Sequence, residues 1–487
     1  MTDCRPSIGL EVHAQLQTQS KMFCACPVVD STSARPNSAV CEVCTGMPGT
    51  LPVANQRAVE YGLRVALALE CTIATTSLFA RKNYFYPDLP KGYQISQYEF
   101  PLAQGGQLTV PLDRGEKRVR IRRVHLEEDT GKLVHQEGSS LIDYNRSGVP
   151  LLEIVTEPDL ESVEEVRHYA AVLRRLLRYL GVNSGDMEKG VIRFEANVSV
   201  RPQGSDVLGT RTEVKNLNSF RALLRAVAFE IERQSALLAA GQPVLQQTLG
   251  WDERGGVTLP QRSKEEAHDY RYFPEPDLPP LVLEPGWIDD VRRSLPELPV
   301  ARMRRFQNAY GLSSSLAGVL TEDRAAADYF EAACAASPGL AAADVAHWVS
   351  GELFSLLNQE GLAIEACPLP PEALAEILRL QQTGRINPTT AKQLLAEVFH
   401  NGGSPTTLVE QRVLAQVTDP SSIDALIAQV EQAHPAQVSQ YLEGKKGIEQ
   451  WLFGQVMRAA SGKADPHIVQ DRLRRRLTEL EKTRRPL

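Results

Sequence analysis

The sequence predicts an α+β protein in which a sheet-containing N-terminal part precedes an all-helical C-terminal part. Two early segments, residues 8–17 and 191–201, alternate apolar and polar side chains with the period of a β-strand. Beyond Pro299 strand signals vanish, and helix-compatible segments rich in Ala and Leu follow one another between Pro, Gly and Asn. The chain of 487 residues is too long for one hydrophobic core, so we expect several domains.

The first predicted strand carries a chemically useful polar face. Leu10 and Val12 point to one side, whereas Glu11 and His13 point to the other. A carboxylate and an imidazole two residues apart on a strand are suited to share a divalent cation. An edge strand with a solvated polar face gives the same pattern, so the alternation leaves both interpretations open.

Charge and composition exclude some classes of protein. The net charge is -7, so any nucleic-acid contact must be local rather than a global basic field. Residues 1–6 lack the apolar core of a signal peptide, and no apolar run is long enough to span a bilayer. We therefore expect a soluble cytoplasmic protein without a membrane partner, whose eight cysteines are free or metal-bound.

Four cysteines form two close pairs at residues 24–44. A loop of Pro, Asp, Ser, Thr and Asn joins the pairs, and residues 46–49 add glycines and a proline. Two thiolate pairs on a flexible loop can close a tetrahedral zinc site, and four sulfurs leave no position open for catalysis. We predict a structural zinc ion held by Cys24, Cys26, Cys41 and Cys44.

Basic and aromatic residues alternate with turns in residues 79–98. Arg81 and Lys82 precede an aromatic cluster that begins at Tyr84. Cations among aromatic rings can hold phosphates and stack a base. A half-buried aromatic corner with two solvated cations explains the pattern nearly as well.

A second chemical cluster lies in residues 118–132, where a strand with four arginines runs into three acids. The apolar phase shifts between Ile121 and Val124, which indicates a β-bulge. Because neighbouring strand residues point to opposite faces, only one of Glu127 and Glu128 can face Glu11 and His13, and the pattern does not say which.

Two helices are clear in the first part of the chain. Ser162 and Glu165 form a capping box before an apolar stripe that Gly181 ends, and a second helix runs from about residue 220 to 240. A loop rich in proline, residues 269–280, closes this part.

The C-terminal helices carry local positive charge. Residues 402–405, Gly-Gly-Ser-Pro, form the best boundary inside the helical region. Residues 441–487 contain 11 Lys and Arg against 6 Asp and Glu, so they could contact phosphates. A solvated charged helix is the alternative.

Six motifs in order along the chain carry a resemblance to a known family. They are IGLEVH at 8–13, RKNYFYPD at 81–88, YQISQ at 93–97, LEED at 126–129, KNLNSF at 215–220 and DYRYFPEPD at 269–277. Together they resemble the GatB/GatE family, which supplies the B subunit of the bacterial aspartyl/glutamyl-tRNA amidotransferase, GatCAB.

The resemblance implies a domain order and an activity. It implies a cradle domain on a mainly antiparallel sheet at 1–297, a helical domain at 298–405 and a YqeY-like tail at 406–487. The cradle would use ATP and Mg²⁺ to phosphorylate the side-chain carboxylate of Glu-tRNA(Gln) or Asp-tRNA(Asn). Ammonia from the partner amidase, GatA, would then displace phosphate, in a complex that also contains the small protein GatC, and the tail would help to hold the tRNA.

The resemblance also assigns roles to residues. Lys82, Glu127 and Glu128 would be catalytic, while Arg81, Lys82, Tyr84, Arg146 and Glu153 would bind the nucleotide. Glu11, His13 and Glu128 would hold Mg²⁺, with Glu127 as a possible neighbour. In the tail, the residues expected to contact tRNA are Lys445, Lys446, Arg458, Lys463, Arg474, Arg475 and Arg476.

Two rival functions follow from the same residues. The chain could be a tRNA-binding scaffold whose partner carries all catalysis, or a metal-dependent hydrolase in which Glu11, His13 and Glu128 activate water. A scaffold would keep its activity after replacement of Glu11 or His13, and a hydrolase would turn over without ATP. No Ser-Lys or Cys-His arrangement supports an independent glutaminase.

Overall fold

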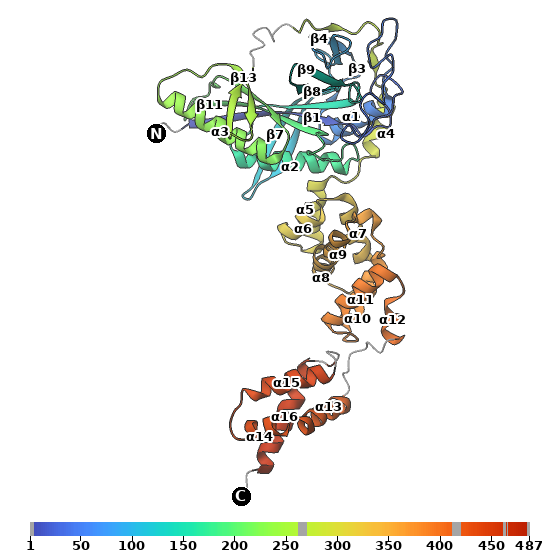
Figure 1. Cartoon of the computed structure of the whole chain (residues 1–487), viewed down its shortest axis with the longest axis vertical. Coiled ribbons are helices and arrows are strands. Elements are labelled where there is room, and N and C mark those ends of the chain that lie inside the picture. The colour runs from blue at the N-terminus through green and yellow to red at the C-terminus, as the bar shows by residue number, and fades with distance from the viewer. Residues whose placement is uncertain (1–3, 262–269, 412–419, 461–463, 465, 485–487) are drawn as a thin grey trace. The chain divides into compact units, whose positions relative to one another are not determined.

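A computed structural model describes residues 4–261, 270–411, 420–460, 464 and 466–484. The chain divides into two compact units, Met1–Arg302 and Met303–Leu487. Figure 1 shows strands in the first unit and helices throughout the second. The predicted α+β class is therefore confirmed.

One large sheet organises the first unit. Among the described residues nine strands pair in the order β14-β13-β12-β11-β1-β10-β7-β6-β2, and only the β12–β13 pair is parallel. The mainly antiparallel sheet is thus confirmed, with the first predicted strand near its centre. The strands are β1 Cys4–Gln15, β2 Thr72–Ile73, β6 Ala103–Pro111, β7 Glu116–Glu128, β10 Pro150–Thr156, β11 Ile192–Pro202, β12 Thr212–Leu217, β13 Gln247–Asp252 and β14 Val257–Pro260.

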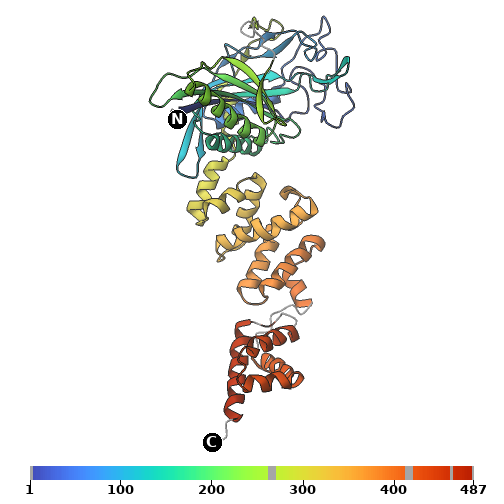
Figure 2. The ribbon, with the colours of Figure 1, turned by 60° about the vertical axis from the view of Figure 1, so that its left-hand side comes forward.

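Helices cover the apolar face of this sheet. Leu10, Val12 and Ala14 of β1 are fully buried in a core that helices α1, α2, α3 and α4 share. Figures 1 and 2 show α2 and α3 against the same side of the sheet. The polar side chains of β1, which include Glu11 and His13, lie on the opposite face. The helices are α1 Gln56–Ala68, α2 Val163–Tyr179, α3 Phe220–Ala239 and α4 Pro285–Arg293.

Local signals in the sequence explain where α2 begins and ends. The Ser162 side chain accepts a hydrogen bond from the Glu165 backbone N–H at 3.1 Å. The Glu165 carboxylate accepts from the backbone N–H of Glu161, one residue before the predicted position. Gly181 takes a left-handed φ of 66°, which favours glycine after a helix end.

The predicted bulge lies in β7. The pairing of β7 with β10 skips Arg122, so Val155 pairs with Arg123 and Thr156 with Ile121. This shift keeps both Ile121 and Val124 on the buried side, at 1% and 0% exposure.

Small sheets extend the unit beside the polar face. A three-stranded sheet joins the basic segment to the proline-rich loop through β4 Ala80–Asn83, β5 Tyr93–Ser96 and β15 Phe273–Pro274. Two further pairs are β3 Thr76–Ser77 with β16 Leu281–Val282, and β8 Lys132–Gln136 with β9 Ser139–Asp143.

The second unit contains two helical cores. The first includes residues from Phe306 to Val409, and the second includes residues from Ile423 to Leu477. Val409 lies beyond the Gly-Gly-Ser-Pro segment yet is fully buried in the first of these cores, so that core continues past residue 405. The helices are α5 Pro299–Tyr310, α6 Ser314–Leu320, α7 Arg324–Ala335, α8 Ala342–His347, α9 Phe354–Glu360, α10 Pro371–Gln382, α11 Pro388–Asn401, α12 Pro405–Gln411, α13 Pro420–Ala433, α14 Pro435–Leu442, α15 Ile448–Ala459 and α16 Pro466–Arg484.

None of the described helices combines the length and the apolar character needed to cross a membrane.

Candidate active site and metal centres

The polar face of three central strands brings the candidate site together. In the registers of β1, His13 lies opposite Glu153 of β10 and Arg193 of β11, and Glu11 lies opposite Glu195. Directly opposite residues in an antiparallel pair share one face of the sheet. The two alternating segments noted in the sequence are therefore neighbouring strands of a single polar surface.

Three side chains at the centre of this surface could hold a cation. Oxygen and nitrogen atoms of His13, Glu127 and Glu153 all lie within 4.8 Å of one another. His13 Nε2 is 3.6 Å from a carboxylate oxygen of Glu127 and 3.6 Å from one of Glu153. Two carboxylates offer the oxygen ligands that Mg²⁺ prefers, whereas the imidazole is a less usual ligand for it. This donor set suits a divalent cation.

His125 also contacts this cluster, through Glu153. Its Nε2 lies 3.0 Å from a Glu153 carboxylate oxygen, while its Nδ1 is buried without a hydrogen-bond partner in the described part of the chain. The imidazole is 2% exposed. Glu153 thus bridges two histidines, His13 and His125, which come from different strands.

The three groups of the cation site shift one another's pKa values. Burial raises the pKa of the Glu127 carboxyl, as does the nearby charge of Glu153. Burial also opposes a charged His13, but the hydrogen bond and charge of Glu153, helped by Glu127, raise the pKa of His13 to about 9. Glu153 keeps a pKa well below its usual range, because the two imidazoles outweigh the effect of its burial. Without a bound cation, the carboxylate of Glu153 therefore favours the charged form of His13.

A second acidic group lies next to the first on the same face. Carboxylate oxygens of Glu11, Glu195 and Glu213 lie within 4.8 Å of one another. Asn197 donates to Glu11 at 2.9 Å, and Lys215 Nζ lies 2.7 Å from Glu195 and 3.0 Å from Glu213. Glu11 therefore belongs to a different group from His13.

Glu128 is placed differently from the expectation. Its carboxylate accepts hydrogen bonds from the Lys91 ammonium and, at 2.9 Å, from the backbone N–H of Ile95, and the side chain is 3% exposed. Glu127 and Glu128 alternate along β7, so only Glu127 shares the polar face with His13. The expected trio of Glu11, His13 and Glu128 is not formed, and Glu127 and Glu153 accompany His13 instead.

Lys82 lies close to this cluster without an ion pair among the described residues. Its Nζ lies 4.8 Å from the centre of the Tyr270 ring. Burial disfavours its charge, yet Tyr272, Glu127 and Glu153 raise the pKa of Lys82 above its ordinary value. Burial raises the pKa of Tyr84, whose ring centre lies 5.9 Å from that of Tyr270. Lys82 is therefore a half-buried lysine whose charge is influenced by Glu127 and Glu153.

Two arginines expected to bind the nucleotide are already engaged by the protein. Arg81 donates to both carboxylate oxygens of Glu275, at 2.8 and 2.7 Å, and to Asp277 at 3.0 Å. Arg146 donates to the backbone carbonyls of Thr130 and Gly131, each at 2.9 Å. Both arginines therefore hold loops in place.

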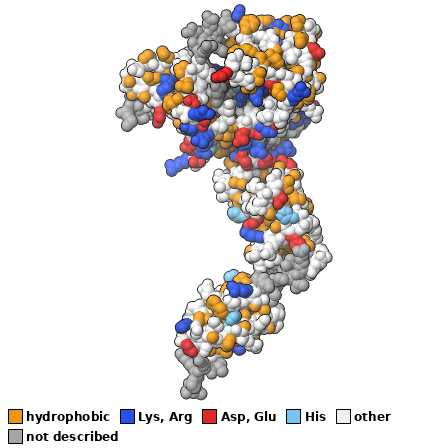
Figure 3. All heavy atoms as spheres, viewed as in Figure 1, with side chains coloured by type: hydrophobic (Ala, Val, Ile, Leu, Met, Phe, Trp, Pro, Cys, Tyr) orange, Lys and Arg blue, Asp and Glu red, His pale blue; other side chains and the backbone are white. Residues whose placement is uncertain are grey.

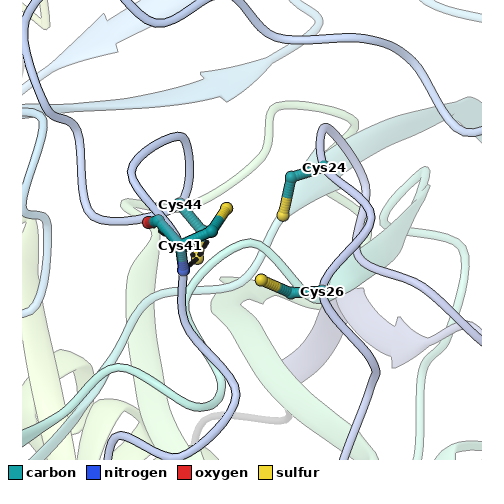
Figure 4. A group of neighbouring side chains, drawn as sticks. All are labelled: Cys24, Cys26, Cys41 and Cys44. Atoms are coloured by element: carbon teal, nitrogen blue, oxygen red, sulfur yellow. Dashed lines mark hydrogen bonds between the residues drawn. The ribbon is translucent and has the colours of Figure 1, made fainter.

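The four cysteines of the first loop converge (Figure 4). Their sulfurs lie within 4.8 Å of one another, and those of Cys41 and Cys44 are 3.9 Å apart. A tetrahedral zinc ion with bonds of about 2.3 Å needs sulfurs about 3.8 Å apart, so the donor set fits zinc. The pKa of Cys44 falls to about 4, first because the Cys24 thiol donates to it, while burial raises the pKa of Cys26 to about 11.

The expected tRNA contacts in the tail differ in their surroundings. Lys446 pairs with Glu481, Arg474 with Glu449 at 3.1 Å, and Arg476 with Glu431 at 3.3 Å. Lys463 lies outside the described residues. Three further cations, Lys445, Arg458 and Arg475, are exposed and make no ion pair within the described tail. On the face shown in Figure 3, the basic side chains of the tail are scattered rather than gathered into one patch.

The sequence reasoning missed the roles of several residues. His125 is two residues before Glu127 on the same strand, so alternation alone could have placed it on the polar face. Lys91 and Lys21 gave no signal, because their partners come from distant segments, Glu128 and the cysteine loop.

Comparisons with known proteins identify the family of the chain. Residues 6–289 match the family described as the GatB/GatE catalytic domain, and residues 328–477 match the GatB domain family GatB_Yqey. A Moorella thermoacetica protein is 52% identical over 474 residues, which cover 96% of this chain and 99% of the relative. A Carboxydothermus hydrogenoformans protein is 47% identical over 485 residues, which cover 99% and 100%. Both relatives are named as the B subunit of an aspartyl/glutamyl-tRNA(Asn/Gln) amidotransferase.

Proposed function

The chain belongs to the GatB/GatE family, and from this premise we propose that it is the B subunit of an ATP-dependent, glutamine-dependent tRNA amidotransferase. This is the family expected from the motifs, and relatives of nearly full length carry the same name. The enzyme is a carbon–nitrogen ligase that acts within a complex. The partners proposed for this chain are the amidase GatA, the small protein GatC, and Glu-tRNA(Gln) or Asp-tRNA(Asn).

The proposed reaction has two steps. A side-chain carboxylate oxygen on the misacylated tRNA attacks the γ-phosphorus of ATP, and the bond to ADP breaks. Ammonia then attacks the activated acyl carbon, phosphate leaves, and the nitrogen loses a proton as the amide forms. The first step concentrates negative charge, so it requires positive groups fixed before the reaction.

One observation carries the assignment: His13, Glu127 and Glu153 converge within 4.8 Å beside a lysine that has no ion pair among the described residues, Lys82. In the proposed site the first three residues would hold Mg²⁺. A bound Mg²⁺ would offset charge on the phosphates of ATP. Lys82 would orient the γ-phosphate, and Tyr84, Tyr270 and Tyr272 would exclude water from that side.

The assignment departs from the first expectation in two ways. Glu127 and Glu153 replace Glu128 and Glu11 as the proposed partners of His13, because they share its group of ligand atoms. Glu11 belongs to the neighbouring acidic group, where it would bind a second cation or a cationic part of the substrate. Arg81 and Arg146 are proposed to position loops and not to touch ATP, since carboxylates and carbonyls occupy them.

Cation binding and phosphoryl transfer can be tested separately. Titration of the heterotrimer with Mn²⁺, followed by electron paramagnetic resonance, should show a site whose affinity Glu153→Gln weakens at least tenfold. The control is Glu164→Gln, which removes a 55% exposed carboxylate on α2. Equal Mn²⁺ affinity in wild type and Glu153→Gln would contradict the cation site.

The phosphoryl-transfer assay uses ATP and Glu-tRNA(Gln) without ammonia, and measures ADP formation that depends on the charged tRNA. Wild type should form ADP and Glu127→Gln should lose most of the rate. Hydrolysis of Glu-tRNA(Gln) in a parallel reaction without ATP would instead favour a metal-dependent hydrolase. Unchanged rates in the variant would favour a scaffold whose partner carries the chemistry.

A further inference from the structure

A buried lysine lies against the four-cysteine cluster. Lys21 is 0% exposed, and its Nζ lies 3.5 Å from Cys44 Sγ and 3.2 Å from the backbone carbonyl oxygen of Tyr144. Among the described residues, the Lys21 ammonium donates to these two atoms alone. A lysine is almost never fully buried without a partner for its charge, so this placement calls for a negative group nearby.

The charge of a loaded zinc site would supply that group. Four thiolates and one Zn²⁺ together carry two negative charges, and Cys44, the buried member of the four, is the one that Lys21 touches. We propose that Lys21 is a positioning residue for the zinc centre: its ammonium offsets the charge of the thiolates and ties the cysteine loop to the turn at residues 144–149. This inference rests on the zinc ion of the proposed function and not on the ATP-dependent reaction.

The turn at 144–149 is fastened to the cysteine loop at several points. Besides the Lys21 contact, the Ser147 hydroxyl donates to the Cys44 carbonyl at 3.2 Å, and the Met22 backbone N–H donates to the Gly148 carbonyl at 2.7 Å. Farther along the loop, the Ala39 backbone N–H donates to the Asn145 side-chain oxygen at 2.9 Å. The cysteine loop therefore holds the turn through several hydrogen bonds. Among these contacts, only that of Lys21 involves a charged side chain.

The same turn holds the end of β7, the strand that carries Glu127 and Glu128. The Gly148 backbone N–H donates to the Asp129 carbonyl at 3.0 Å, and the Asp129 backbone N–H donates to the Val149 carbonyl at 2.8 Å. Gly148 also has a left-handed φ of 84°, and a Cβ there would lie 3.5 Å from Lys21 Cδ and 3.9 Å from a Glu128 oxygen. Lys21 thus lies between the zinc loop and the strand end of Glu127 and Glu128.

Replacement of Lys21 by methionine separates charge from packing. Methionine keeps an unbranched stem of similar length and loses the ammonium, so Lys21→Met tests the charge and the N–H···S contact. Removal of a group that hydrogen-bonds to a metal ligand typically weakens metal binding by about 10- to 100-fold. We expect the purified heterotrimer with Lys21→Met to transfer zinc to a chelator at least tenfold faster than wild type.

The matched control is Lys189→Met. Lys189 contacts the same loop through an exposed ion pair with Asp30 at 2.8 Å and does not touch a sulfur. Zinc release from this variant should equal that of wild type. Equal release from Lys21→Met and wild type would overturn the inference, as would equally accelerated release from both variants.

A spectroscopic measurement tests the charge directly. In heterotrimer loaded with Co²⁺, the sulfur-to-metal charge-transfer band of Lys21→Met should move to longer wavelength, because a thiolate without a neighbouring positive charge gives up an electron more easily. A role in packing alone would leave the band in place, which would contradict the proposal. Wild-type protein that binds neither zinc nor Co²⁺ would also overturn it, while leaving the proposed ATP-dependent reaction untouched.

A third measurement needs no variant, and so remains decisive if Lys21→Met does not fold. Hydrogen exchange of wild type is compared with zinc and after its removal. Residues 144–149 should exchange faster after removal, whereas the β13–β14 hairpin, which is remote in sequence from the cysteine loop, should not change. Equal exchange of the turn in both states would show that zinc does not support it.

Discussion

Arg193 and Asp129 form a two-point ion pair beside the proposed cation site. The two terminal nitrogens of Arg193 lie 3.0 and 3.1 Å from the two carboxylate oxygens of Asp129, which is 3% exposed. The pair joins β11 to the end of β7, and Gln15 of β1 donates to the same carboxylate at 2.9 Å. Asp129 therefore ties the end of β7, which carries Glu127, to β11 through Arg193 and to β1, which carries His13, through Gln15.

This pair predicts a defined acid sensitivity. Burial alone would raise the pKa of Asp129, but Arg193 and Arg146 lower it to about 2, below the ordinary 3.8. A lowered folded-state pKa stabilises the protein above pH 3.8, and that contribution is lost as the pH falls from 3.8 through 2. It amounts to about 2 kcal/mol at neutral pH.

The measurement is hydrogen exchange of peptides from β1 and β11, which reports this unit separately from the helical one. Asp129→Asn should lose protection at pH 7, and its difference from wild type should shrink as the pH approaches 2. Asp113→Asn, at an exposed turn position, serves as control. A pH-independent difference would show that packing and not charge accounts for the effect.

Lys82→Met should impair phosphoryl transfer more than nucleotide binding. Lys82 lies beside Glu127 and Glu153 and has no ion pair among the described residues, so its charge is available to the developing charge on the γ-phosphate. Loss of one such donor typically costs on the order of 10²-fold in kcat. Lys132→Met, an exposed lysine of the β8–β9 hairpin, is the control.

The assay is ammonium-dependent amidation by the heterotrimer at varied ATP. A rise in KM for ATP with kcat unchanged would mean that Lys82 only binds the nucleotide.

Two neighbouring arginines of the tail should contribute differently to tRNA binding. Arg475 is exposed without an ion pair in the described tail, whereas Arg476 contacts Glu431. Arg475→Ala should weaken tRNA binding and lower the slope of log affinity against log salt by about 0.7 to 0.9, the value for one phosphate contact.

Arg476→Ala should change that slope less, because its charge is already offset. Fluorescence anisotropy of labelled tRNA at several KCl concentrations gives both slopes. Equal slopes for wild type and Arg475→Ala would remove Arg475 from the interface.

The sequence predicted the polar face well but not the neighbours across it. Alternation correctly placed Glu11 and His13 away from the core, and the apolar phase shift correctly indicated the bulge in β7. Alternation cannot say which strands pair, so it could not show that Glu153 lies between His13 and His125.

Long-range ion pairs were equally invisible in the sequence. Arg81 and Lys82 are adjacent and both basic, yet β4 points them to opposite sides. Arg81 meets Glu275, which lies 194 residues away, while Lys82 faces the cluster of carboxylates. Only the paired fold shows that Arg81 is held in an ion pair and that Lys82 lies near the carboxylates.

The most direct test of the proposed cation site is ammonium-dependent conversion of Glu-tRNA(Gln) to Gln-tRNA(Gln) by wild type, Glu127→Gln and the control Glu164→Gln in the reconstituted complex. Free ammonium bypasses the amidase, so the assay reports the chemistry assigned to this chain. We predict that Glu127→Gln binds tRNA normally and loses at least about 100-fold in rate, while Glu164→Gln matches wild type. A wild-type rate in Glu127→Gln would contradict the assignment of the cation site to His13, Glu127 and Glu153.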